Sequence, residues 1–145
     1  MKAEFLQMLI TRYEEARFTV DRRITALIRE RMPDDLTPEQ YSMLSYLSGK
    51  DTCTSSELSD VFCVGRSSIT AIISRLADKE LIRRVPHGSD RRVTYLKLTP
   101  LGEQLALQMK ERVGEMLAGY MEHFDEKEAI TFIETYEKLA RVLHQ

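Results

Sequence analysis

The segment from residue 54 to residue 99 constrains the fold most, because two short helical patterns directly precede a basic hairpin. The first apolar face, at Leu58, Val61 and Phe62, follows a Thr-Ser-Ser-Glu run that has the form of a capping box. Gly65 then interrupts the pattern, since a helix interior tolerates glycine poorly. A second stripe repeats every three or four residues, at Ile69, Ile72, Ile73 and Leu76. This order predicts a helix-turn-helix.

The polar face of the second helix carries small side chains and arginine rather than the Glu and Lys mixture of an ordinary soluble helix. Small polar groups let a helix approach base edges, and arginine reaches guanine or phosphate. We therefore expect this helix to enter a DNA major groove, the alternative being a merely solvated surface. The residues predicted to bind DNA from this helix are Arg66, Ser67, Ser68, Thr70, Ala71, Ser74 and Arg75.

Two strand patterns follow this helix, at residues 81–85 and 93–98, and Arg84 on the first is a further predicted DNA contact. The loop between them is rich in turn-forming residues and ends in Arg91 and Arg92. A hairpin with a charged tip after a recognition helix is a wing, whose tip arginine can enter a minor groove. The alternative for the tip is a solubilising loop.

Charge is distributed unevenly along a chain whose net charge is −2. Between Arg66 and Lys97, eight basic residues face three acidic ones, a net charge of +5. From Pro100 to the end, five basic residues face nine acidic ones, a net charge of −4. A local basic patch on an acidic chain is typical of a site-specific DNA binder, so double-stranded DNA is the predicted partner.

Capping signals place the other helices. Thr37 is followed by proline and then by glutamine three residues on, and Thr99 is also followed by proline. Asp125 begins an acidic run that starts a last helix, and Gly49 marks a helix end. The short segment at residues 51–53 is a candidate third strand beside the hairpin.

Long apolar patterns flank the central segment on both sides. Residues 5–32 present more apolar surface than one small winged module can cover, so part of it is expected to pack on a partner chain. The predicted fold is mainly α, an α+β winged helix-turn-helix with six helices and a small hairpin. Its terminal helices would form an obligate homodimer that presents two recognition helices about 34–36 Å apart to a pseudo-palindromic site. The expected parts are an N-terminal dimerisation helix, a DNA-binding core and C-terminal dimerisation helices, at 1–32, 33–99 and 100–145.

Other protein classes find little support in the sequence. No apolar run is long enough to cross a bilayer and the N-terminus lacks a signal-peptide pattern, so we expect a cytoplasmic protein. The three histidines lack metal-ligand spacing, and no catalytic combination or phosphate-binding glycine loop is present. We therefore predict no enzymatic activity, cofactor or metal. An effector pocket between dimer helices and winged module is expected, without assigned residues.

The two cysteines, Cys53 and Cys63, make no disulfide framework. Both fall around the helix-turn-helix core, where small apolar side chains pack and buried thiols are inert. Core filling is therefore the expectation, with thiol-based redox sensing through Cys53 or Cys63 as the alternative.

Several motifs together resemble the MarR (multiple antibiotic resistance regulator) family across essentially the whole chain: Arg66-Ser-Ser-Ile-Thr, Ser89-Asp-Arg-Arg-Val93 and Leu98-Thr-Pro-Leu-Gly102. The resemblance implies a winged-helix homodimer, usually a repressor that leaves its operator when a small molecule or an oxidant acts on it. It also implies that Asp90 orients Arg92 in the minor groove while Arg91 meets phosphate. The alternative in another class is a winged-helix protein-interaction module that does not bind DNA.

Glu80 departs from the family pattern, which most often has glycine in Lys-Gly-Leu. A helix C-cap there favours a left-handed backbone, which glutamate adopts less readily than glycine. The peroxide-sensing branch of the family uses a cysteine near the start of the first helix, and this sequence has none there.

Overall fold

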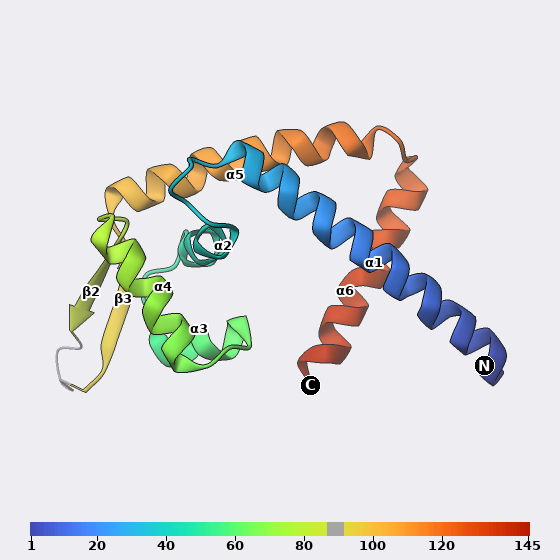
Figure 1. Cartoon of the computed structure of the whole chain (residues 1–145), viewed down its shortest axis with the longest axis horizontal. Helices are drawn as coiled ribbons and strands as arrows, with labels where there is room; N and C mark the ends of the chain where they lie inside the picture. The colour runs from blue at the N-terminus through green and yellow to red at the C-terminus, as the bar shows by residue number, and fades with distance from the viewer. Residues whose placement is uncertain (87–91) are drawn as a thin grey trace. The chain divides into compact units, whose positions relative to one another are not determined.

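The computed structural model of the chain describes residues 1–86 and 92–145 (Figure 1). The chain divides into two units, Met1–Lys110 and Glu111–Gln145. The elements in chain order are α1 (Ala3–Arg31), α2 (Pro38–Leu47), β1 (Cys53–Thr54), α3 (Ser55–Phe62), α4 (Arg66–Asp78), β2 (Ile82–Pro86), β3 (Thr94–Leu98), α5 (Pro100–Met121) and α6 (Glu126–His144). Helix α5 runs from the first unit into the second. The described residues thus form six helices and one small sheet, which confirms the predicted winged helix-turn-helix class.

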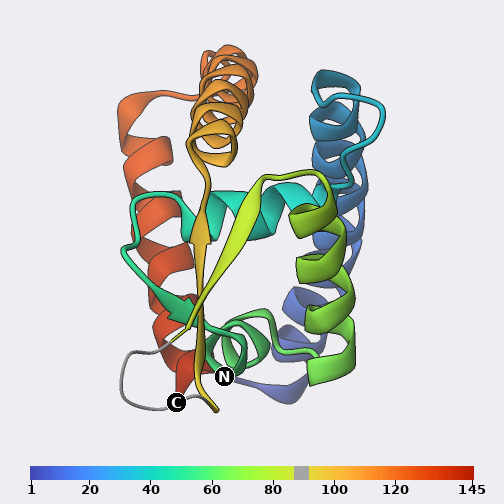
Figure 2. The ribbon, with the colours of Figure 1, turned by 90° about the vertical axis from the view of Figure 1, so that its left-hand side faces the viewer.

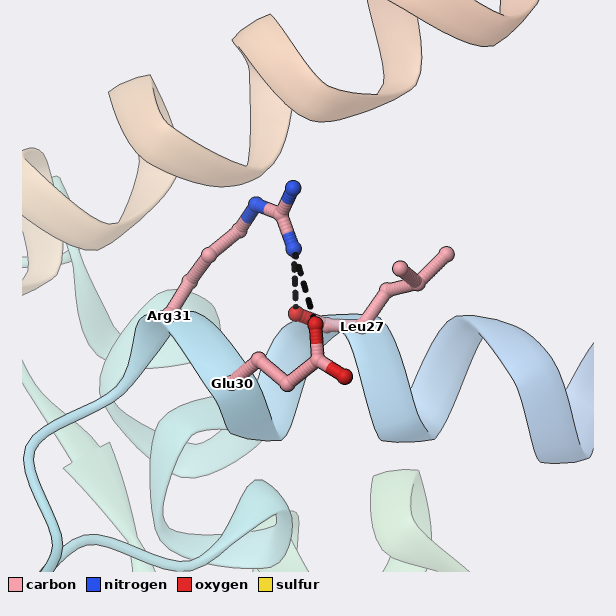
Figure 3. A network of polar contacts seen from close by, with 3 residues as sticks. All are labelled: Leu27, Glu30 and Arg31. Carbon is pink, nitrogen blue, oxygen red and sulfur yellow. Dashed lines mark hydrogen bonds and ion pairs between the residues drawn. The ribbon is translucent and has the colours of Figure 1, made fainter.

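Helix α1 has 29 residues and none of them is buried. It contains no proline, so nothing interrupts its backbone hydrogen bonds until Pro33 follows its end. Arg31 stabilises its last turn, because its Nη1 donates to the Leu27 carbonyl at 2.8 Å and lies 3.9 Å from the Glu30 carboxylate (Figure 3). A cation there satisfies a terminal carbonyl and opposes the helix dipole.

The predicted capping signals are confirmed at three helix starts. Thr37 and Gln40 form a reciprocal capping box before α2, and Asp125 and Glu128 form another before α6. The hydroxyl of Thr99 accepts the Gly102 amide at the start of α5. Gly49 follows α2 in the left-handed region at φ 77°, which only glycine adopts freely.

The sheet is antiparallel, with strand order β1-β3-β2 (Figure 2). Its register pairs Ile82 with Leu98 and Cys53 with Leu96. A third strand therefore forms beside the hairpin as expected, but at Cys53–Thr54 rather than at residues 51–53. Because Leu96 and Leu98 lie on one face of β3, that face is buried in the core of the first unit.

The core of the first unit draws on α2, α3, α4, the sheet and α5. All four members of the predicted α4 stripe are buried, but of the α3 face only Leu58 is buried and Phe62 is half-buried. Val61 is 49% exposed, so its expected place on the apolar face is wrong. Helix α3 has only eight residues and buries a single one. A helix this short has too few turns for the spacing of its apolar residues to show which face is buried.

The second unit comprises the end of α5 and the whole of α6. Helix α6 buries no residue although its apolar side chains recur at helical spacing. Phe132 and Tyr136 stack on its surface with ring centroids 5.3 Å apart. Within the two described stretches of the chain, no helix is both long and apolar enough to span a membrane.

Candidate DNA-binding surface

The polar face of α4 is largely open to solvent. Its apolar stripe is buried on the opposite side, so the 3.6-residue period turns the intervening residues outward. Of the predicted contacts on this helix, Ser74 is half-buried and the following six are exposed: Arg66, Ser67, Ser68, Thr70, Ala71 and Arg75. The structure thus brings all seven together on one accessible surface.

The N-terminus of α4 suits a negatively charged ligand. Gly65 is the N-cap and offers no side-chain hydrogen bond, and the first turn contains no acidic residue. The first-turn N–H groups are therefore without a side-chain cap, and the helix dipole adds partial positive charge there. Backbone phosphate fits such a site.

Arg66 is positioned by the preceding helix. Its Nη2 donates to the Ser56 hydroxyl at 2.7 Å, and its carbonyl accepts the Thr70 hydroxyl at 2.8 Å. Sequence reasoning missed Ser56, because the run at residues 54–57 predicts only a helix cap. That cap is half confirmed, since the Thr54 hydroxyl accepts the Glu57 amide at 3.1 Å. The exposed Ser56 hydroxyl adds a polar group beside the predicted face.

The turn between α3 and α4 is a Schellman motif centred on Cys63. The Cys63 amide donates to Asp60 and the Val64 amide to Ser59, and Cys63 has a left-handed φ of 53°. Gly65, expected to provide the break, instead has a φ of −69°. Cys63 is exposed, so its predicted role in core filling is wrong: the turn, not the helix face, fixes its position.

Cys53 is buried as predicted, at 1% exposure. Burial, assisted by the neighbouring Glu57, raises the pKa of its thiol to about 12. The thiolate is the reactive form of cysteine, so Cys53 is held in its unreactive state near neutral pH.

The wing strand is tied to α4 by Arg84, whose Nη2 donates to the Ser74 hydroxyl at 3.5 Å. Arg83 and Lys97 lie directly opposite each other on β2 and β3. Their positive charges repel each other, and a bound polyanion would reduce this repulsion. Arg92 is exposed just before β3. The predicted contacts Asp90 and Arg91 lie outside the described residues. Among the described residues, no group of three His, Cys, Asp or Glu side chains could hold a metal ion.

An exposed helix α4, supported by α3 and followed by the β2–β3 strand pair, is the arrangement of a winged helix-turn-helix protein. Residues 36–94 match the MarR family. YsmB, an HTH-type transcriptional regulator of Bacillus subtilis, is 31% identical over 123 residues, which cover 81% of this chain and 84% of YsmB. The chain belongs to the MarR family, as the resemblance predicted.

Solved structures agree with this assignment. A cysteine-to-serine mutant of MarR from E. coli, complexed with operator DNA, is 25% identical with a TM-score of 0.78, over 90% of this chain and 94% of that one. A MarR family protein from Bacillus stearothermophilus has a TM-score of 0.81 over 100% of this chain and 99% of that one. At 23% identity, this second match shows the fold alone.

Proposed function

We propose that this MarR-family regulator is a homodimeric repressor that binds a pseudo-palindromic DNA operator and is released by a small-molecule effector. The observation that carries the proposal is the accessible α4 face, on which seven small or basic side chains lie opposite a buried stripe. The similar E. coli protein that was solved with operator DNA supports double-stranded DNA as the partner. No catalytic step is part of this function.

Each part of the surface has a distinct role in the proposal. Residues 67–75 read base edges in the major groove, where small side chains permit close approach. Arg66 and the N-terminus of α4 hold phosphate, which gives affinity and register but little sequence information. Arg92 enters the minor groove, oriented by Asp90, and Arg91 meets phosphate, as the family resemblance implies.

The outer helices support the homodimer. A soluble monomer rarely leaves a continuous apolar face open to water, and a second copy of the same chain covers such a face symmetrically. Helices α1 and α6 each lack any buried residue. Their large exposed apolar side chains are Phe5, Leu6, Met8, Ile10, Tyr13, Phe18 and Val20 on α1, and Ile130, Phe132, Ile133, Tyr136, Val142 and Leu143 on α6.

A cavity of about 390 Å³ in the first unit supports the effector. It lies between the loop after α1, the end of α4 and the first turns of α5. Leucine side chains dominate its apolar lining, and an aspartate, a lysine and two glutamines add polar groups. The lining residues are Pro33, Asp35, Leu36, Lys79, Leu81, Leu101, Gln104, Leu105 and Gln108. A mostly apolar site with a few polar groups is typical of small-molecule binding.

Selection from a pool of random duplexes with the purified chain tests the proposal. Repeated binding and amplification should enrich an inverted repeat, and affinity for the enriched duplex should fall steeply with salt because bound phosphates release counterions. Affinity for a random duplex of equal length provides the control. If no sequence is enriched and binding is insensitive to salt, the chain is a protein-interaction module and the repressor proposal is wrong.

A further inference from the structure

The turn that joins α4 to β2, residues 79–81, is fixed from three directions. It closes α4 as a Schellman motif, in which the Glu80 amide donates to Ala77 at 2.9 Å and the Leu81 amide to Leu76 at 3.0 Å. Glu80 is held in the left-handed region at φ 61°. A non-glycine residue persists there only when its surroundings compensate for the strain, so the contacts around it are informative.

Thr99, at the start of α5, holds this turn by two hydrogen bonds. Its hydroxyl donates to the Glu80 carbonyl at 2.6 Å, and its amide donates to the Leu81 carbonyl at 3.0 Å. The same hydroxyl accepts the Gly102 amide at 3.0 Å. One side chain therefore caps α5 and anchors the end of α4.

Gly102 brings α5 against the turn. A Cβ atom at this position would lie 2.1 Å from the Leu81 carbonyl oxygen. Because that oxygen belongs to the backbone, the clash could be relieved only if the turn or the helix moved. The glycine at the end of the Leu-Thr-Pro-Leu-Gly motif is thus required because α5 approaches the turn at residues 79–81 too closely for a side chain. The two other glycines of α5, Gly114 and Gly119, meet nothing within 4 Å of such an atom.

Lys79 holds the other side of the turn. Its ammonium donates to the Asp35 carbonyl in the loop after α1 and, at 2.9 Å, to Oε1 of Gln40 on α2. Gln40 is only 4% exposed, and the same Oε1 accepts the Thr37 amide in the α2 capping box. A buried polar side chain with several partners has few alternative positions. The bond from Lys79 to Gln40 therefore fixes the position of the turn as well as holding it to α2.

The angle of α4 matters because the helix acts as a lever. Its 13 residues rise about 1.5 Å each, which makes the helix about 20 Å long. A tilt of about 10° at the C-terminal joint would move the N-terminus by about 3–4 Å. Base-edge hydrogen bonds tolerate only a few tenths of an ångström, so a loose joint misplaces Arg66, Ser67 and Ser68.

We propose that residues 79–81 form a rigid joint that sets the angle of the recognition helix, and that Thr99 and Gly102 are positioning residues for sequence-specific DNA binding. This inference rests on the proposed function. It predicts a loss of sequence discrimination rather than a loss of DNA binding, since none of the three contacts with α5 contributes charge to phosphate binding.

Two matched pairs of variants test the joint. Thr99→Val removes the hydroxyl while Thr99→Ser keeps it; Gly102→Ala adds the clashing methyl while Gly114→Ala adds the same group to an open position of α5. The probes are the duplex selected by the wild-type chain and a random duplex of equal length, titrated at one salt concentration. We expect Thr99→Val and Gly102→Ala to lower the ratio of the two affinities about tenfold, with random-duplex affinity unchanged within about twofold. Thr99→Ser and Gly114→Ala should match wild type.

The proposed role of the joint is wrong if the ratio of the two affinities keeps its wild-type value in Thr99→Val and Gly102→Ala. It is also wrong if both affinities fall together, because that indicates loss of the fold or of the dimer. Should Gly102→Ala not fold, the threonine pair decides alone.

Amide hydrogen exchange tests the joint without DNA. The Leu81 and Thr99 amides should exchange at least about tenfold faster in Thr99→Val and Gly102→Ala, while the β2–β3 ladder keeps its protection. Unchanged exchange at both amides overturns the joint. If the wild-type chain selects no DNA sequence, the repressor proposal fails, whereas this result still reports on the joint.

Discussion

Helix α4 and the outer helices, α1 and α6, differ in how much of their apolar surface is buried within the chain. Helix α4 buries four of its 13 residues against its own chain and ends in a turn bonded to α5. Helices α1 and α6, with 29 and 19 residues, bury none, although both carry apolar side chains at helical spacing. The difference teaches that one apolar pattern has two destinations. In α4 it builds the core of the chain, whereas most of it stays exposed on the outer helices, where we propose that a second copy of the chain covers it.

Removing a core side chain from α4 should have the largest effect. Leu76 is fully buried, so Leu76→Ala should lower the free energy of unfolding by about 2–5 kcal/mol, because it deletes apolar contacts and leaves a cavity. Urea denaturation followed by circular dichroism measures it. Leu143→Ala makes the same change at a residue 72% exposed on α6 and, at concentrations where the chain is monomeric, should cost less than about 0.5 kcal/mol. Equal costs would remove the contrast between the two regions.

A charge on the apolar face of α6 should break the dimer while sparing the fold. Ile133→Asp places a carboxylate on a face that a partner would bury, where an unpaired charge is strongly disfavoured. Sedimentation equilibrium should show a monomer at micromolar concentration, with an unchanged helical spectrum. Thr131→Asp introduces the same charge on the opposite side of α6 and should remain dimeric. A dimer in both variants would place the interface elsewhere.

Loss of the wing arginine should weaken DNA binding without touching either the core or the dimer. Arg92→Ala is expected to cost about 1–3 kcal/mol of affinity for the selected duplex, because it removes a minor-groove contact. Gel-shift titration at fixed salt measures the loss. Arg141→Ala, on α6, removes an equal charge and should leave affinity within about twofold of wild type. No difference between the two variants would contradict the wing assignment.

Relieving the backbone at the end of α4 should stabilise the chain slightly. Glu80→Gly replaces a left-handed glutamate and should raise the free energy of unfolding by about 0.5–1 kcal/mol, since glycine adopts this conformation without steric cost. Thermal unfolding detects the shift. Glu111→Gly puts glycine within α5 and should destabilise by roughly 1 kcal/mol. A destabilised Glu80→Gly variant would mean that the glutamate side chain makes a contribution larger than the strain.

Peroxide should have the smallest effect. Burial holds the Cys53 thiol protonated, with a pKa of about 12, so mild peroxide should leave affinity for the selected duplex unchanged. The Cys53→Ser/Cys63→Ser double variant should behave identically. Loss of binding in the wild-type chain alone would instead establish redox sensing, with the exposed Cys63 as its first candidate.

Local patterns were sufficient for much of the fold and for the position of the candidate site. The caps at Thr37 and Asp125 depend on residues three positions away, and the α4 stripe on neighbours within two turns. The same period that buries the stripe exposes the polar face that we propose reads DNA. The long helices, the hairpin and the third strand followed from equally local signals, so the winged-helix class was within reach of the sequence.

The sequence alone thus determined where helices begin, which face of α4 is polar and that Glu80 would occupy a backbone conformation that favours glycine. Only the tertiary structure decided that Cys63 is exposed, that Ser56 meets Arg66, and that Lys79 reaches Gln40 across 39 positions of the chain. The physical reason is range. Helix spacing and capping are written in adjacent residues, whereas a contact between distant segments exists only once the whole core has set their distance and angle.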